Sequence, residues 1–220
     1  MKIYFASPGS QLHADKLRGQ AVLLSYGAAL KHGWWDRWIH SYDSILLDSG
    51  AFSEHQSGIE VELPAYLDWV AKFPRIDAFA GLDDINGDWR RSLRNYAAGG
   101  GFPSYHDTDP EELLDELIPM ARERGGWLGI GLKPPRTQRE DWLRRTLDRI
   151  PEELHVHGWA LSAYSYLPGF DSFDTTHWWR DALKLCGLMP WLTHGEALEL
   201  MVKKLTRAGL MPSNNGDLGL

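Results

Sequence analysis

Short apolar runs alternate along the chain with longer stretches in which apolar residues recur every three or four positions. A short apolar run bounded by turn residues is typical of a buried strand, and the longer spacing is typical of a helix with one apolar face. The runs predict about eight strands, over residues 2–6, 21–26, 44–48, 77–83, 102–106, 126–133, 154–161 and 170–174. The amphipathic stretches predict helices over residues 63–72, 89–98, 109–124, 138–149 and 193–208.

Strands that alternate with helices predict an α/β fold with a parallel sheet, because consecutive parallel strands need a crossover connection. About eight strands is the number that a (β/α)8 TIM barrel needs, and such barrels typically have about 250 residues. With 220 residues, the chain is expected to form a trimmed barrel in which loops replace some helices. A doubly wound open sheet competes, but the sequence has no convincing glycine-rich dinucleotide loop near its start. We expect one catalytic domain over residues 1–210 and a frayed tail over residues 211–220.

Polar residues follow several of the predicted strands. In a barrel the chemistry lies at the C-terminal ends of the strands, so these side chains are expected to converge on one rim. Carboxylates and imidazoles that converge in this way predict an active site. The residues concerned are Asp48, Asp83, Asp84, His106, Lys133, His157 and Asp174.

Composition narrows the classes of protein that fit. The single cysteine, Cys186, excludes an internal disulfide and any zinc site built from several thiolates. A formal net charge of -7 argues against a protein that coats nucleic acid through a broad basic surface. No apolar run approaches the length of a membrane span, and the N-terminal segment is interpreted as a strand rather than a secretory signal. A cytoplasmic setting is therefore expected.

Five short segments follow predicted strands or lie at their ends between Ile45 and Arg180. They are LLDSGAF (46–52), GLDD (81–84), FPSYHD (102–107), GIGL (129–132) and DSFDTT (171–176). These segments resemble motifs of the tRNA-guanine transglycosylase family, and they occur in the family's order. The tRNA enzymes carry a zinc site of three cysteines and a histidine, which a chain with one cysteine cannot build. In its short length and lack of this site, the chain is similar to the phage-borne branch that places 7-deazaguanine (preQ0-type) bases into DNA.

The resemblance implies a base exchange that needs no metal or other cofactor. Its substrates would be duplex DNA, with the target guanine flipped out, and a free 7-deazaguanine base. The protein would then act in the cytoplasm of a phage-infected bacterium. A tRNA substrate is the alternative. Whether a partner protein contributes to nucleic-acid binding stays open.

The resemblance also implies roles for particular residues. Asp174 would be the nucleophile that attacks C1′ of the nucleotide, and Asp48 would exchange protons with the departing and incoming bases. Asp83 would accept hydrogen bonds from the edge of a guanine-like base. The remaining base-binding candidates are His106, Gly131, Leu132 and Phe52, and the weaker candidates for nucleic-acid contact are Arg90, Arg94 and Lys133.

Each of these positions alone also has a structural interpretation. The sequence Asp-Ser-Gly after a strand is a common turn, and Asp174 with Thr175 could cap a helix that contains Trp178 and Trp179. Asp84 is expected to contribute to the N-cap of the helix that follows it. The order of the five segments favours the functional interpretation of Asp48 and Asp174 taken together.

Two other classes of protein stay open. His155 and His157 share one strand face, so they could bind a metal together with Asp174 and His106, as in a metal-dependent TIM-barrel hydrolase. The other histidines lack the spacing of a second ligand pair. A non-catalytic nucleic-acid-binding barrel is the third hypothesis, and the sparse positive charge argues against it.

Overall fold

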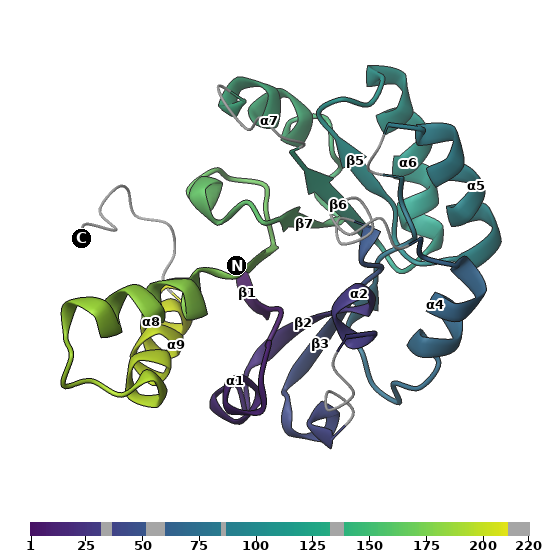
Figure 1. Cartoon of the computed structure of the whole chain (residues 1–220). Coiled ribbons are helices and arrows are strands. Elements are labelled where there is room, and N and C mark those ends of the chain that lie inside the picture. Colours follow the sequence, from purple (N-terminus) through teal and green to yellow (C-terminus); the bar gives the residue numbers. More distant parts are fainter. Residues whose placement is uncertain (32–36, 52–59, 85–86, 133–138, 211–220) are drawn as a thin grey trace.

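A computed structural model describes residues 1–31, 37–51, 60–84, 87–132 and 139–210. In this part of the chain, eight parallel strands form one curled sheet that is flanked by helices (Figure 1). The predicted α/β class and parallel sheet are confirmed. The strands are β1 (Lys2–Ala6), β2 (Ala21–Ser25), β3 (Ser44–Asp48), β4 (Ala78–Phe79), β5 (Ser104–His106), β6 (Trp127–Gly131), β7 (His155–Trp159) and β8 (Ser172–Thr175).

The strand order is β4-β3-β2-β1-β8-β7-β6-β5, so the first strand lies beside the last. Every hydrogen-bonded strand pair in this order is parallel. An isolated parallel bridge between Ala80 and Phe102 links the chain just after β4 to the chain just before β5. A curled parallel sheet in which the first strand meets the last is a TIM-like (β/α) arrangement.

Helices connect most of the strands and cover the outside of the sheet (Figure 1). All five predicted helices are present, with ends that shift by a few residues. Two short helices near the N-terminus were not predicted, because a single turn or two shows little apolar periodicity. The α-helices are α1 (Gln11–Lys16), α2 (Tyr26–Ala29), α4 (Leu63–Val70), α5 (Trp89–Gly99), α6 (Glu111–Glu123), α7 (Glu140–Leu147), α8 (His177–Leu188) and α9 (His194–Leu210).

The predicted strand over residues 77–83 is much shorter in the structure. Only Ala78 and Phe79 form β4, although the buried apolar stretch continues through Leu82. Gly81 lies so close to Tyr96 of α5 that a Cβ atom there would stand 2.4 Å from the tyrosine ring. The residues after Phe79 are therefore buried by packing on α5 more than by strand pairing, and burial alone produced the apolar signal.

The expected helix cap at Asp84 is wrong. Asp88 caps α5, because its side chain accepts a hydrogen bond of 3.1 Å from the backbone N–H of Arg91. Asp84 instead forms an ion pair of 3.2 Å with the Arg91 guanidinium. Its own backbone N–H donates to the Ser92 hydroxyl at 2.8 Å. The cap therefore lies four residues further along the chain than expected.

The interior of the curled sheet is filled by side chains from alternate strand positions. Side chains of a strand point to opposite faces in turn, so the residues two positions from an interior residue are interior as well. Leu46 of β3 is fully buried in this interior, which places Ser44 and Asp48 on the same face. The buried interior cluster consists of Tyr4, Ala6, Leu23, Leu46, Ala80 and Phe102.

The other faces of the strands pack against the helices in two larger apolar clusters. The C-terminal helices α8 and α9 pack on each other, and α9 also contacts α1 (Figure 1). Trp178 of α8 is fully buried, and its indole N–H donates to the carbonyl of Ala6 at 3.1 Å. This contact fixes the start of α8 against the end of β1. The predicted tail over residues 211–220 lies outside the described residues.

Among the described residues, no helix is both long enough and apolar enough to cross a membrane.

Candidate active site

Three carboxylates meet at the C-terminal ends of the strands. Asp48 is the last residue of β3, Asp174 lies in β8, and Asp83 follows β4. Burial, together with the nearby Asp83 and Asp174 carboxylates, raises the pKa of Asp48 to about 6 against the opposing effect of Ser25 and Gly50. Such mutual repulsion requires proximity, so residues that lie far apart in the sequence share one site.

His106 lies beside Asp83 at this rim. Its Nε2 atom is 3.4 Å from Oδ2 of Asp83, and its Nδ1 atom is 3.4 Å from Oδ2 of Asp109. The same Asp109 oxygen accepts a hydrogen bond of 2.8 Å from the backbone N–H of His106. Asp109 therefore fixes both the backbone and the ring of His106, and it was not anticipated from the sequence.

Gly131 makes the position of His106 possible. The two residues are direct partners in the pairing of β5 with β6. A Cβ atom on Gly131 would lie 2.6 Å from Cδ2 and 3.0 Å from Nε2 of the His106 ring. Any larger residue would push the ring away from its place, so glycine allows the imidazole to lie flat on the strand. The predicted grouping of His106 with Gly131 thus has a steric basis, and Leu132 next to them has a buried side chain.

Asp174 is buried and held from the neighbouring loop. Its Oδ1 atom accepts a hydrogen bond of 2.7 Å from the backbone N–H of Ala160, just after β7. Ala160 has a φ of 51°, a left-handed conformation that is rare for a residue other than glycine. The backbone at this point is therefore strained in a way that aims an N–H group at the carboxylate.

Asp174 does not cap the helix that follows it. Helix α8 begins at His177, and its N-cap residue, Thr176, makes no side-chain hydrogen bond to the helix. The hydroxyl of Thr175 accepts a hydrogen bond of 3.1 Å from the His177 N–H instead. The capping interpretation is therefore wrong for Asp174, and its carboxylate belongs to the rim.

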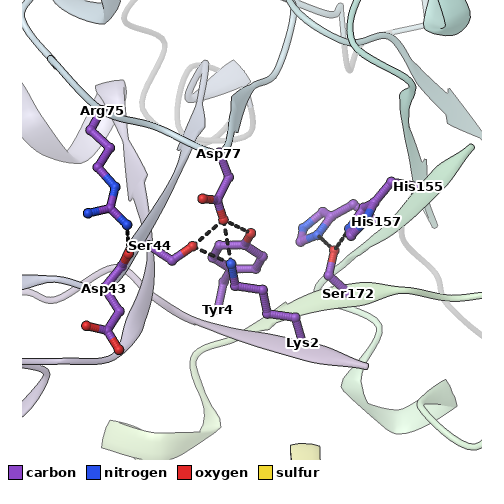
Figure 2. A network of polar contacts seen from close by, with 9 residues as sticks. All are labelled: Lys2, Tyr4, Asp43, Ser44, Arg75, Asp77, His155, His157 and Ser172. Carbon is purple, nitrogen blue, oxygen red and sulfur yellow. Dashed lines mark hydrogen bonds and ion pairs between the residues drawn. The ribbon is translucent and has the colours of Figure 1, made fainter.

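His155 and His157 point to the same hydroxyl. Nε2 of His155 lies 2.7 Å and Nδ1 of His157 lies 2.9 Å from Oγ of Ser172 in β8 (Figure 2). Among the described residues, no group of three or more histidine, cysteine, aspartate and glutamate side chains is arranged to hold a metal ion. The geometry therefore pairs the two histidines with a serine and offers no support for the metal-hydrolase hypothesis.

Trp159 forms part of the wall below the rim. Its indole N–H donates to the Ser104 hydroxyl at 2.9 Å, and its ring stacks on Phe102 with the centroids 5.7 Å apart. A Cβ atom on Gly129 would lie 2.3 Å from the indole nitrogen, so this glycine makes room for the tryptophan. Trp159 thus fills the interior beside His157, 4.5 Å away between ring centroids.

A second polar cluster lies at the opposite ends of the strands. Oδ2 of Asp77 accepts hydrogen bonds from Lys2, at 2.6 Å, and from the hydroxyls of Tyr4 and Ser44 (Figure 2). Burial alone would raise the pKa of Asp77, but these donors outweigh it and lower the pKa. These contacts tie the chain just before β4 to β1 and β3, which is the arrangement of a structural clamp.

The remaining predicted residues fall into two groups. Arg90 and Arg94 are exposed on α5, where Arg90 lies over the Trp89 ring at 4.2 Å and Arg94 lies 3.6 Å from Asp88. Both stay predictions as nucleic-acid contacts. Phe52 and Lys133 lie outside the described residues.

The local sequence pattern did not predict Ser172 or Ala160 as site residues. Ser172 could have been found from its place two residues before Asp174 on a strand, which puts both side chains on one face. Nothing in the local sequence singled out Ala160, because it contributes through its backbone alone.

Comparison of the chain with protein-family models and with curated proteins finds no match.

Proposed function

We propose that this protein is a DNA base transglycosylase that exchanges guanine for a 7-deazaguanine through a covalent aspartyl-sugar intermediate. The observation that carries the proposal is the meeting of Asp48, Asp83 and Asp174 at one end of the sheet, with His106 against Asp83. These are the residues whose sequence segments resemble the transglycosylase family. We also propose that the curled sheet is a trimmed, zinc-less (β/α)8 barrel, which the pairing of β1 with β8 and the bridge between Ala80 and Phe102 support.

In the first step, a carboxylate oxygen of Asp174 attacks C1′ of the flipped nucleotide. The bond between C1′ and N9 of guanine breaks as the bond between C1′ and the Asp174 oxygen forms, and the departing guanine takes a proton from Asp48. In the second step, N9 of the incoming 7-deazaguanine attacks C1′ and gives its proton to Asp48. The bond to Asp174 breaks, and both carboxylates return to their starting states.

The environment of Asp48 suits this exchange of protons. A general acid–base works best when its pKa lies near the working pH, because it must both donate and accept. Burial and two neighbouring carboxylates bring the pKa of Asp48 to about 6. Asp174, by contrast, accepts a hydrogen bond of 2.7 Å from the backbone N–H of Ala160, which holds its carboxylate in place. The two aspartates thus have the different surroundings that different roles require.

Asp83 and His106 supply polar groups for the base. A guanine-like base presents an N1–H and an exocyclic amine, both donors, and the Asp83 carboxylate can accept from them. His106 contributes a ring nitrogen 3.4 Å from the same carboxylate. A site that matches donors with a buried acceptor discriminates strongly against bases that lack those donors.

The choice of DNA over tRNA rests on the resemblance to the short, zinc-less branch of the family. It is tested by incubating the purified protein with 7-cyano-7-deazaguanine and either duplex DNA or tRNA, with and without chelator. Mass spectrometry of the digested nucleosides should detect a deazaguanine nucleoside in DNA only, at the same level with chelator. Product in tRNA only would keep the chemistry and make the DNA substrate wrong. No product with this base or with related deazaguanines would overturn the proposal.

Asp174→Asn and Asp181→Asn form a matched pair for the nucleophile. Asp181 lies on the surface of α8, where it pairs with Lys184 at 2.9 Å, so its loss removes a charge without touching the rim. A covalent protein–DNA adduct on a denaturing gel is expected for the wild type and for Asp181→Asn. It should be absent for Asp174→Asn, with base exchange reduced roughly 1,000-fold or more. An adduct in Asp174→Asn would assign the nucleophile to another residue.

A further inference from the structure

Three polar side chains form a column inside the curled sheet, directly below Asp174. His155 and His157 lie two positions apart on β7, and Ser172 lies two positions before Asp174 on β8. The Ser172 hydroxyl joins the two rings, at 2.7 Å from Nε2 of His155 and 2.9 Å from Nδ1 of His157 (Figure 2). The column thus runs along the sheet interior toward the proposed nucleophile.

His157 is the member of the column nearest to Asp174. Its side chain has no exposed surface, and its Nε2 atom lies 3.6 Å from Oδ1 of Asp174. Among the described residues, this buried nitrogen has no hydrogen-bond partner. The separation exceeds that of a hydrogen bond, so the contact is electrostatic in this state. Tyr4 and Trp159 pack edge-on against the ring, with centroids 5.8 Å and 4.5 Å away, and restrict its rotation.

The Ser172 hydroxyl carries one proton, so the hydrogen bonds along the column can run in two directions. In the first, the Ser172 hydroxyl donates to Nδ1 of His157, and His157 carries its proton on Nε2. In the second, His157 donates from Nδ1 to Ser172, and the bare lone pair of Nε2 faces Asp174. A lone pair directed at a carboxylate is repelled, whereas an N–H group is attracted, so an ionised Asp174 selects the first direction. His155 then donates from its own Nε2 to the Ser172 hydroxyl.

We propose that His157 is a positioning residue for Asp174, held in its Nε2–H form by Ser172 and, through Ser172, by His155. Its role in the reaction rests on the proposed function. The N–H group of His157 and the N–H group of Ala160 both act on Oδ1 of Asp174. Oδ2 receives no hydrogen bond from the described residues, so it is the oxygen left to attack C1′. Burial lowers the pKa of His155, which favours the neutral form of this ring.

The first test reads the proton positions and needs no activity. Long-range proton–nitrogen NMR of histidine-labelled protein distinguishes the two neutral forms of each ring, with His155→Asn and His157→Gln used to assign the signals. We expect His155 and His157 both to carry the proton on Nε2. In Asp174→Asn, which removes the charge that selects this direction, His157 should lose the single form and give a mixture. A His157 proton on Nδ1 in the wild type would overturn the inference, whatever the protein catalyses.

The second test compares His157→Gln with His157→Asn. The glutamine amide can place an N–H where Nε2 stood, whereas the shorter asparagine amide reaches only the place of Nδ1 and keeps the contact with Ser172. We expect covalent adduct to form at least about 10-fold faster in His157→Gln than in His157→Asn, with KM for the base unchanged in both. Equal rates in the two folded variants would overturn the positioning role.

Ser172→Ala serves if neither His157 variant folds, as judged by its thermal melting curve. It removes the hydroxyl without adding volume, and adduct formation should slow about 10-fold while the adduct still forms. An unchanged rate would contradict the proposal. If the wild type exchanges no base at all, the proposed function fails, and the NMR result alone decides the direction of the column.

Discussion

The carboxylate of Asp174 accepts a hydrogen bond of 2.7 Å from the backbone N–H of Ala160. Ala160 has a φ of 51°, so an alanine adopts a conformation that normally belongs to glycine. Backbone strain of this kind persists when the surrounding structure enforces it, and it is concentrated at functional sites. The backbone just after β7 thus adopts a strained conformation that directs its N–H group at the Asp174 side chain of β8.

Replacement of Ala160 by glycine tests this relationship. Glycine adopts the left-handed conformation without cost and keeps the N–H group. Ala160→Gly should therefore leave base exchange within about 2-fold of the wild type and change the free energy of unfolding by no more than about 1 kcal/mol. Urea denaturation and the nucleoside assay measure the two quantities. A large loss of activity would show that the methyl group of Ala160 matters more than its N–H.

Asp48 should make the protein less stable as the pH rises. Burial raises its pKa from an ordinary 3.8 to about 6, so between these values the folded state holds a proton that the unfolded state has lost. The free energy of unfolding then falls as the pH increases through this window, by roughly 3 kcal/mol at most. Asp48→Asn removes the effect, so the variant should gain stability over the wild type from pH 4 to pH 7. Urea denaturation across this range checks the prediction. An equal gain in unfolding free energy at pH 4 and at pH 7 would contradict it.

The same residue should shape the pH dependence of the reaction. If Asp48 must accept the proton of the incoming base, kcat/KM for the 7-deazaguanine should decline below about pH 6, where the carboxylate is protonated. Asp48→Asn should reduce the exchange roughly 100-fold or more at every pH. A pH profile with its midpoint near 4 would assign this step to another group.

Asp83 and Asp84 are adjacent but differ in their contacts. Asp83 lies beside His106 at the rim, and Asp84 pairs with Arg91 on α5. Asp83→Asn should weaken binding of the deazaguanine about 10- to 100-fold, because an amide presents a donor to the donors of the base. Asp84→Asn should change this affinity by less than about 3-fold. Isothermal titration with the free base measures both, and equal effects would remove Asp83 from the base site.

Gly131 and Gly187 offer a matched pair for the steric argument. Alanine at Gly131 would bring a Cβ atom 2.6 Å from the His106 ring, whereas a Cβ atom at Gly187 of α8 meets nothing within 4 Å. Gly131→Ala should cost about 1–3 kcal/mol of unfolding free energy and weaken base binding, since His106 must move. Gly187→Ala should stabilise the helix by up to about 1 kcal/mol. Unaltered stability and binding in Gly131→Ala would mean that the ring moves freely.

Asp77 at the opposite end should respond to pH in the other direction. Its pKa is lowered by Lys2, Ser44 and Tyr4 despite its burial, so the carboxylate stabilises the fold above its unfolded pKa. This contribution is lost as the pH falls through the lowered pKa of the folded state. Asp77→Asn should cost about 1–3 kcal/mol at pH 7 and less below pH 4. Base exchange by Asp77→Asn should stay near the wild-type level when it is assayed below the melting temperature. This result would show that the Asp77 cluster stabilises the fold without taking part in the reaction at the rim.

Local sequence accounts for much of the fold. Apolar runs located all eight strands, and three- and four-residue spacing located the five longer helices outside α8, because both signals depend only on neighbours in the chain. Prediction from the local sequence failed where the pattern was too short or ambiguous. Helix α2 has only four residues, and the apolar run at Ala78 continues past the end of the strand pairing.

The candidate site also has features that local sequence determines and features that it does not. The sequence by itself determined that Asp48 and Asp174 stand at strand ends, because position on a strand follows from local pattern. Only the tertiary structure decided that Asp83 and Asp174 raise the pKa of Asp48, that Ala160 donates to Asp174, and that His157 meets Ser172. Each of these depends on the distance between side chains and backbone groups from different strands, and that distance is set by the curling of the sheet rather than by any residue's neighbours in the chain.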